Sequence, residues 1–478
     1  MNNNFLIAVG GSGQMIALAY FRLARLCGFK EPAHLYIMDS DFVGDNDVTK
    51  MLDKLLGKKR ISTIKPIPQD INYNSFSDIF HNNENAQFDE KIDNVLGLLF
   101  TQEELNTNIE KGMYGKPPVG STCLNVKIDN IEMNENALNA TAKDPLIKLV
   151  NDISRSKNSK VVICGSLFGG TGAGGVPTLA KYIRGKVGLD VEITIIDLMR
   201  WFHLSQDQKV SEEARLRYNE ESGIFYLKDK IANYVDACVL LGPKTTTERT
   251  HQEVGAQTEK PNYINLFAAV IASNTFNITA ITDLFAVQNS IYCYATPVGN
   301  LKASDIDVIL PTENNTVEYK VKLNEIIQLA MATNEFLGFF ANYIYEGSIP
   351  GFSFFPSLTV PSNLKRAEKK LGTDALKKIY DAVKQRKDDY IEILDWFEEL
   401  TEDGSFETNE NEITTNAYKK TSKSPMPFLR QWISKIEVDS FGERVNTAEE
   451  FVDQMIKKLR LMINSKFIEE RFGKMEFM

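Results

Sequence analysis

The most constraining feature of this sequence is a glycine-rich segment that runs from Gly165 to Gly175 and reads GSLFGGTGAGG. It follows the apolar, β-branched run Val161–Cys164 and precedes Val176–Ile183, a stretch typical of a helix. A strand, a glycine-rich turn and a helix together present backbone N–H groups and the positive end of a helix to an anion. Because glycine has no Cβ, the main chain can also approach a phosphate closely. The segment therefore indicates a phosphate-binding loop, and a tight structural turn is the alternative.

The same segment also points to a family. No Gly-Lys-Ser/Thr follows it, so it is not a Walker A loop. Its GGTGAGG pattern instead resembles the signature of tubulin and of its bacterial relative FtsZ, written GGGTGTG or GGGTGSG. The resemblance implies a nucleotide-binding α/β domain in which this loop holds phosphates. The candidate residues are Gly169, Gly170, Thr171, Gly172, Ala173 and Gly174.

A second glycine turn lies near the N-terminus. The apolar strand Phe5–Val9 leads into Gly10, Gly11, Ser12, Gly13 and Gln14, and an apolar helix is expected from Met15 to about Leu26. This arrangement resembles the first phosphate loop of the tubulin family. A dinucleotide-binding Rossmann protein begins in the same way, so this turn alone leaves both interpretations open.

The next expected strand, His34–Met38, ends at Asp39. The resemblance to tubulin and FtsZ implies that Asp39 lies close to the Mg²⁺ ion bound to the nucleotide. In a Rossmann protein the same acid would instead hold a ribose hydroxyl.

A third loop, Gly112–Ser121, separates these two interpretations. It resembles the γ-phosphate-sensing loop of FtsZ, whose pattern is Gly-x-Gly-x-Asn-Pro-x-x-Gly. Gly115 and Gly120 match this pattern, while Lys116 replaces the Asn and would bring positive charge to a terminal phosphate. The alternative is an ordinary Pro/Gly surface loop.

Further elements follow in the order of the family. We expect strands at Asp190–Asp197 and Asp236–Leu241, with a helix over about 211–234 between them. A central helix is expected from Pro261, and its start resembles the tubulin segment in which Tyr263 would stack on the purine. Plain packing is the alternative for Tyr263. Phe267 stands at the family's guanine-reading Asn, which leaves guanine and adenine both open.

The resemblance also implies a way to hydrolyse the nucleotide. In tubulin and FtsZ an acidic loop of the neighbouring subunit completes the site, and the candidate acids here are Asp283, Asp305 and Asp307. Phosphoryl transfer depends on positioning and charge neutralisation. We therefore expect at most a GTPase whose activity is slow or depends on assembly.

Composition sets further limits. With 478 residues the chain is too long for one core, and its formal net charge of −10 disfavours broad nucleic-acid binding. Neither the cysteines nor the four histidines form a metal-ligand pattern, so no protein metal centre is expected. No apolar run of membrane-spanning length and no signal peptide are evident, and we expect a cytoplasmic protein.

The order of elements predicts an α/β fold with a parallel, Rossmann-like sheet flanked by helices. We expect a nucleotide-binding domain over 1–260 with an insertion at about 60–110, the central helix over 261–284, a second, smaller α+β domain over 285–362 and a helical C-terminal region over 363–478. The last of these regions is highly charged and contains amphipathic helices. An apolar stripe of this kind is more often ordinary core, and a surface for a protein partner is the alternative.

Three functions fit these features. The first is a tubulin/FtsZ-like protein that binds GTP or GDP with Mg²⁺ and, as the resemblance implies, self-associates head to tail into filaments. The second is the same site working as a nucleotide-dependent switch or scaffold with a partner protein. The third is a Rossmann NAD-binding protein. It is the least favoured because the richest glycine loop lies near residue 170 rather than after the first strand.

Overall fold

The structure is a computed structural model, and the chain divides into two compact units. The first comprises Met1–Arg25, Phe29–Val298 and Val308–Tyr319, and the second comprises Leu26–Gly28, Gly299–Asp307 and Lys320–Met478. The residues it describes are 4–27, 32, 34–40, 47–67, 75–81, 89–113, 115–133, 144–156, 158–204, 210–243, 247–249, 262–278, 290–296, 306–311, 318–346, 374–402 and 447–462.

The first unit is built on a seven-stranded sheet of order β3-β2-β1-β4-β5-β7-β9, in which every neighbouring pair is parallel. The strands are β1 (Asn4–Val9), β2 (Leu35–Met38), β3 (Ile61–Ile64), β4 (Lys160–Ser166), β5 (Glu192–Leu198), β7 (Ala237–Pro243) and β9 (Ser290–Thr296). The parallel α/β fold predicted from the sequence is confirmed.

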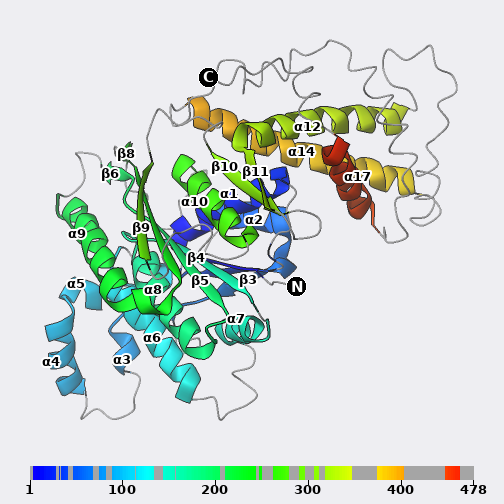
Figure 1. Cartoon of the computed structure of the whole chain (residues 1–478). Coiled ribbons are helices and arrows are strands. Elements are labelled where there is room, and N and C mark those ends of the chain that lie inside the picture. The colour runs from blue at the N-terminus through cyan, green and yellow to red at the C-terminus, as the bar shows by residue number, and fades with distance from the viewer. Residues whose placement is uncertain are drawn as a thin grey trace. The chain divides into compact units, whose positions relative to one another are not determined.

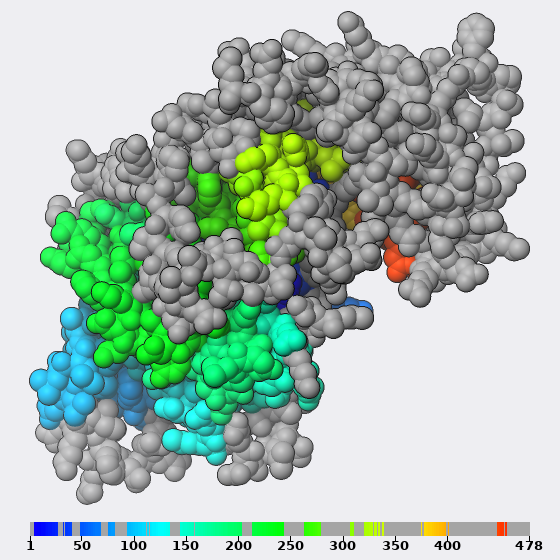
Figure 2. Space-filling model, viewed as in Figure 1, coloured from blue at the N-terminus to red at the C-terminus, as the bar shows by residue number. Residues whose placement is uncertain are grey.

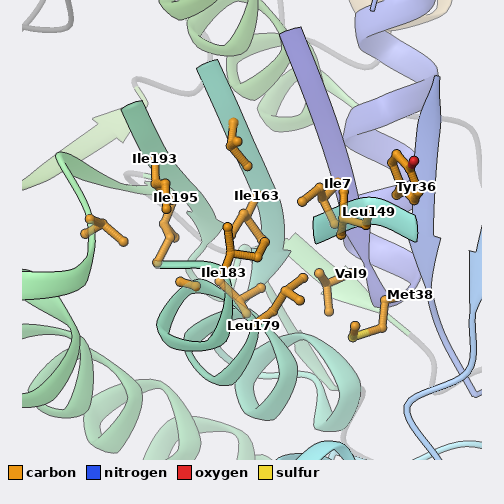
Figure 3. Packing of buried hydrophobic residues seen from close by; sticks show 14 of the residues in the cluster. Ile7, Val9, Tyr36, Met38, Leu149, Ile163, Leu179, Ile183, Ile193 and Ile195 are labelled. Carbon is orange, nitrogen blue, oxygen red and sulfur yellow. The ribbon is translucent and has the colours of Figure 1, made fainter. Parts of the chain in front are cut away.

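Helices cover both faces of this sheet (Figure 1). They are α1 (Gly10–Cys27), α6 (Pro117–Met133), α7 (Pro145–Ser154), α8 (Gly170–Lys186), α9 (Val210–Tyr226) and α10 (Tyr263–Asn277). On one face, Leu179 and Ile183 of α8 lie against Ile163 of β4 (Figure 3). On the other face, α10 packs on β4, β5 and β7. Burial of these apolar side chains is the main favourable term that holds the layers together.

The segment between β2 and α6 contains the residues of the insertion expected at about 60–110. Part of it joins the sheet, because β3 pairs with β2 at one end of the strand order. The sequence of β3, ISTI, is half polar and contains no apolar run that would predict a buried strand. Three of its four residues are not fully buried. The rest is short helices: α2 (Asp47–Leu56), η1 (Lys58–Arg60), α3 (Asp78–His81), α4 (Asp89–Leu99), α5 (Gln102–Leu105) and η2 (Ile109–Lys111).

Two helices begin earlier than the sequence predicts. We expected α1 from Met15 and the next helix after the signature from Val176, but they begin at Gly10 and Gly170. The glycine-rich segments are therefore largely the first turns of helices rather than open loops. The glycines at these helix ends pack closely against neighbouring backbone.

The remaining elements are short or belong to the second unit. After α9 come a π-helical turn, η4 (Leu227–Ile231), and η5 (Ala232–Tyr234), and β6 (Phe202–Leu204) pairs with β8 (Thr247–Arg249). A two-stranded sheet joins β10 (Asp307–Pro311) to β11 (Glu318–Lys322). The second unit packs α12 (Leu323–Glu346), α14 (Ala375–Glu402) and α17 (Ala448–Met462) together. Among the residues described here, no helix is both long and apolar enough to cross a membrane.

Candidate phosphate-binding site

The strand order reverses between β1 and β4, since β2 and β3 continue on one side and β5, β7 and β9 on the other. In doubly wound sheets, ligands bind beyond the carboxyl ends of the strands at such a switch point. Here α1 starts directly after β1, and α8 starts four residues after β4. The fold therefore brings two helix N-termini to the place where this class of protein binds ligands.

The two helix N-termini touch each other. A Cβ added to Gly10 would lie 3.3 Å from the backbone N of Gly172 and 3.5 Å from Cβ of Thr171. Gly10 also has a φ of +69°, a conformation that side chains disfavour. Glycine is required at this position by both its conformation and the closeness of the second loop.

The N-terminus of α8 has unused donors. Its N-cap residue is Gly169, which has no side chain to cap the helix. The first intrahelical bond at this end runs from the N–H of Ala173 to the carbonyl of Gly169, at 3.0 Å. The N–H groups before Ala173 have no acceptor within the helix, and such groups are suited to an anion.

The third predicted loop lies against the same helix end. A Cβ on Gly120 of α6 would collide with the carbonyl oxygen of Gly170, and one on Gly174 would lie 2.5 Å from the backbone N of Ser121. A Cβ on Gly170 would meet Met113 at 2.5 Å. These glycines let α6 and α8 pack backbone to backbone. Close packing of α6 on α8 is thus one reason why the signature segment is rich in glycine, beside the predicted binding of a ligand.

Two predicted residues from separate segments, Gln14 and Thr171, meet a third, Asp39. Nε2 of Gln14 donates to Oδ2 of Asp39 at 2.8 Å, and the hydroxyl of Thr171 lies 3.4 Å from Oδ1. The backbone N of Ser40 also donates to Oδ1, and Thr49 donates to the Gln14 side-chain oxygen. Asp39 is only 7% exposed. The cluster offers oxygen ligands of the kind that Mg²⁺ prefers, beside the helix ends.

Within the described ranges there is no group of three or more His, Cys, Asp or Glu side chains that could hold a metal ion. Mg²⁺ is usually bound by one or two carboxylates together with substrate phosphates. The chemistry of Asp39 and Thr171 fits an ion that arrives with a nucleotide.

Lys116 lies beside the site, but its ammonium is engaged elsewhere. Its Nζ donates to the backbone oxygen of Glu103 and to the hydroxyl of Thr107, both at 3.0 Å. It also lies 3.1 Å from the Glu103 carboxylate, which forms a second ion pair with Arg215 of α9. Lys116 and Arg215 hold the pKa of Glu103 below its usual value, with Lys116 the larger cause.

The predicted base-contacting residue opens α10. Tyr263 is the first residue of that helix and is 4% exposed. Asn262 caps the helix and forms a capping box with Asn265, whose Oδ1 accepts from the N–H of Asn262 at 2.9 Å. Lys160 donates to the carbonyls of Thr275 and Ile278 at the other end of α10. The helix is thus fixed at both ends.

Of the candidate catalytic acids, Asp283 and Asp305 lie outside the described residues. Asp307 is the first residue of β10 and belongs to the second unit, and its carboxylate pairs with Nζ of Lys322 at 2.7 Å.

Two residues near the site belong to none of the motifs read from the sequence. Asn219 of α9 donates to the carbonyls of Gly115 and Phe168, at 2.7 and 3.4 Å. It lies on a polar helix with no motif around it. Asp197, at the carboxyl end of β5, is fully buried, and neither carboxylate oxygen has a hydrogen-bond partner. Burial raises its pKa to about 8. Its acidic type within an apolar strand was the available signal.

No protein-family model matches this chain, and no curated protein matches it. Among solved structures 31 chains match. One is CetZ2 from Haloferax volcanii, described as a GTPγS-bound protofilament, which is 16% identical over 70% of this chain and 72% of its own, with a TM-score of 0.33. The function proposed below rests on the residues and contacts of this chain.

Proposed function

We propose that the first unit binds the polyphosphate of a mononucleoside triphosphate, GTP in the first instance, between the N-termini of α1 and α8. The observation that carries this proposal is the contact of Gly10 with Thr171 and Gly172, which places two helix N-termini together at the switch point of the sheet. Two positive helix ends, together with the N–H groups at the start of α8 that have no acceptor within the helix, favour several negative charges at one place.

The arrangement fits a mononucleotide better than a dinucleotide. A dinucleotide fingerprint places its main glycine loop directly after the first strand. Here the longer glycine segment follows β4, and α6 packs onto it through Gly120 and Gly174. Three glycine-containing segments thus lie together at the same end of the sheet, which favours a compact polyphosphate over an extended dinucleotide.

Asp39 and Thr171 would hold a Mg²⁺ ion that enters with the phosphates, and the ion would neutralise charge on them. Gln14 holds the Asp39 carboxylate through the 2.8 Å hydrogen bond. That contact keeps the carboxylate oriented for the ion.

Tyr263 is the candidate for the base contact, as the resemblance to the tubulin family implies. Its ring is 4% exposed, so stacking on a base requires neighbouring side chains to move when nucleotide enters. The side-chain oxygen of Asn265 accepts a hydrogen bond in the helix cap, so we do not assign Asn265 to base recognition. The preference between guanine and adenine is therefore a direct test.

The resemblance further supports head-to-tail self-association with hydrolysis at the subunit contact, where Asp283, Asp305 and Asp307 are the candidate acids. Contacts between unlike faces that do not close produce open filaments. The alternative remains a switch or scaffold that binds nucleotide and a partner protein without polymerising, for which the charged helices α14 and α17 are candidates.

The binding step is tested by identifying the nucleotide retained by the purified protein, followed by calorimetric titration with GTP and ATP in Mg²⁺. Two variants, Ser12→Glu and Ala173→Glu, add a carboxylate at partly exposed positions in the first turns of α1 and α8. A first-turn carboxylate favours a helix but repels phosphate. We expect both variants to fold and to lose the nucleotide.

The matched control is Asn130→Glu, which adds the same charge at an exposed position on α6. It should retain nucleotide fully. Equal retention in all three variants would remove the helix ends from the site. Recovery of a nicotinamide dinucleotide would support the Rossmann alternative instead.

Light scattering and phosphate release then separate the two modes of action. Scattering that rises only with a triphosphate supports the assembler. Bound nucleotide without scattering supports the switch.

A further inference from the structure

The side chain of Asn219 joins two loops that are far apart in the sequence. Its Nδ2 lies 2.7 Å from the carbonyl oxygen of Gly115 and 3.4 Å from that of Phe168. Both partners are acceptors, and in an asparagine side chain only the amide nitrogen can donate. The amide therefore has one orientation that satisfies both contacts.

Each of these loops leads into one of the helices at the site. Gly115 is followed by Lys116 and the start of α6, and Phe168 is followed by the N-cap of α8, Gly169. Neither loop is hydrogen-bonded to the other by the backbone bonds described for these segments. Asn219 is the side chain that connects them.

The rest of the same α9 face also lies on these loops. Leu216 Cδ2 would be 3.6 Å from a Cβ on Gly115, and Gly223 approaches Leu167 so closely that a Cβ there would lie 3.1 Å from it. Residues 216, 219 and 223 are spaced as neighbours on one helix face. The same helix holds the loop after β5, because Oε1 of Glu220 accepts from the backbone N of Arg200 at 3.0 Å.

The opposite side of α9 is on the surface of its unit (Figure 2), where Tyr218 and Phe225 are 63% and 65% exposed. Among the described residues, the contacts of α9 with these loops all come from its inner face. Its inner face contacts three loops at the carboxyl ends of the strands, so its position affects all three.

We propose that Asn219 is a positioning residue that sets the spacing between the Gly115 loop and the Phe168 loop, and that this spacing selects triphosphate over diphosphate. The inference rests on the function proposed above. A terminal phosphate must reach the Gly115 loop while the inner phosphates stay on α8. Small errors in such positioning lose the added contact. A diphosphate needs only the α8 side, so it does not sense the spacing.

The test compares the affinities for GTPγS and GDP in Asn219→Asp, measured by calorimetry in Mg²⁺. Aspartate has the same shape but only accepts hydrogen bonds, so it loses both contacts and repels both carbonyls. We expect the affinity for GTPγS to fall about tenfold, which corresponds to about 1.4 kcal/mol. We expect the affinity for GDP to change less than about twofold, because a diphosphate does not reach the Gly115 loop and so does not depend on where Asn219 holds it.

Asn219→Ala serves as a second variant that removes the amide without adding charge, and it should show the same selective loss. Asn130→Asp on α6 is the control for an added negative charge at an exposed position. The thermal midpoint of each variant is measured alongside, since a merely structural role would lower it and would reduce both affinities together.

The outcomes are distinguishable. An equal loss for GTPγS and GDP, or no loss in either variant, overturns the role of Asn219 while leaving nucleotide binding in place. A wild-type protein that binds neither nucleotide overturns the proposed function itself. If the wild-type protein prefers adenine, the same comparison is made with ATPγS and ADP.

Discussion

Lys116 Nζ lies 3.1 Å from Oε1 of Glu103, so the cation predicted for a terminal phosphate is neutralised by a side chain of the preceding short helix. Lys116 is nearly buried, while the Glu103 side chain is 71% exposed. An exposed carboxylate gives up a partner at low cost, because surface ion pairs contribute little. A competing anion would therefore replace the Glu103 carboxylate at low cost, while Nζ keeps its hydrogen bonds to the Glu103 carbonyl and the Thr107 hydroxyl.

Glu103→Gln is accordingly expected to raise the affinity for a triphosphate by a few-fold, about 0.5–1 kcal/mol on the scale of exposed ion pairs. The diphosphate should bind as before. Glu110→Gln is the control, because it removes an equal charge from an exposed residue in the same segment. Unchanged triphosphate binding in Glu103→Gln would mean that Lys116 only anchors α5.

The glycines of α8 are expected to differ sharply in what they tolerate. Gly174→Ala would force a Cβ within 2.5 Å of the Ser121 backbone N, and overpacking of this kind costs about 1–3 kcal/mol. Gly185 lies on the same helix with nothing within 4 Å of an added Cβ. Gly185→Ala should therefore stabilise the helix by up to about 1 kcal/mol. Thermal midpoints decide this, and equal midpoints would contradict the packing account.

The central strands and one contact of the site could be predicted from the sequence. Strands β1, β4, β5 and β7 are apolar, β-branched runs, and their buried, parallel pairing follows from that composition. The meeting of Asp39 with Thr171 follows in turn from the parallel sheet, since the carboxyl ends of its strands share one edge.

The rest depended on contacts that no local pattern encodes. Glycine disfavours a helix in isolation, so α8 was expected to start after the glycines, although packing on α6 makes helical glycine necessary. Lys116 pairs with Glu103, which lies thirteen residues earlier in a polar segment. Asn219 reaches the site from a helix with no motif. Each of these contacts is set by tertiary packing, and it involves residue types that are common throughout the chain.

Asp39→Asn should remove the dependence of nucleotide binding on Mg²⁺. An amide can still pair with Gln14, but it binds a hard cation poorly because it carries no charge. We expect the affinity of the variant in Mg²⁺ to fall to the value that the wild-type protein shows with a chelator. Asp53→Asn on α2 is the control, and it should keep the full effect of Mg²⁺. A variant that still responds to Mg²⁺ would place the ion elsewhere.

The last prediction concerns Asp197 and pH. Burial raises its pKa from an ordinary 3.8 to about 8, so the carboxyl is protonated in the folded protein at neutral pH and ionised in the unfolded chain. The folded state then binds more protons between these two values, and stability must fall as pH rises from about 4 to about 8. The neighbouring Cys164 thiol, whose pKa is also raised by burial, stays neutral throughout and adds nothing to this slope.

Asp197→Asn carries no titrating proton and should lose this slope. We expect the wild-type protein to lose stability on the order of 5 kcal/mol across that interval at most, since each pKa unit is worth about 1.4 kcal/mol. The variant should match the wild-type protein near pH 4 and exceed it by a growing margin up to pH 9, as measured by thermal midpoints in the absence of nucleotide. Exposed Asp190→Asn should keep the wild-type slope. Parallel curves for wild type and Asp197→Asn would show that the buried carboxyl is ionised and has a compensating partner in solution.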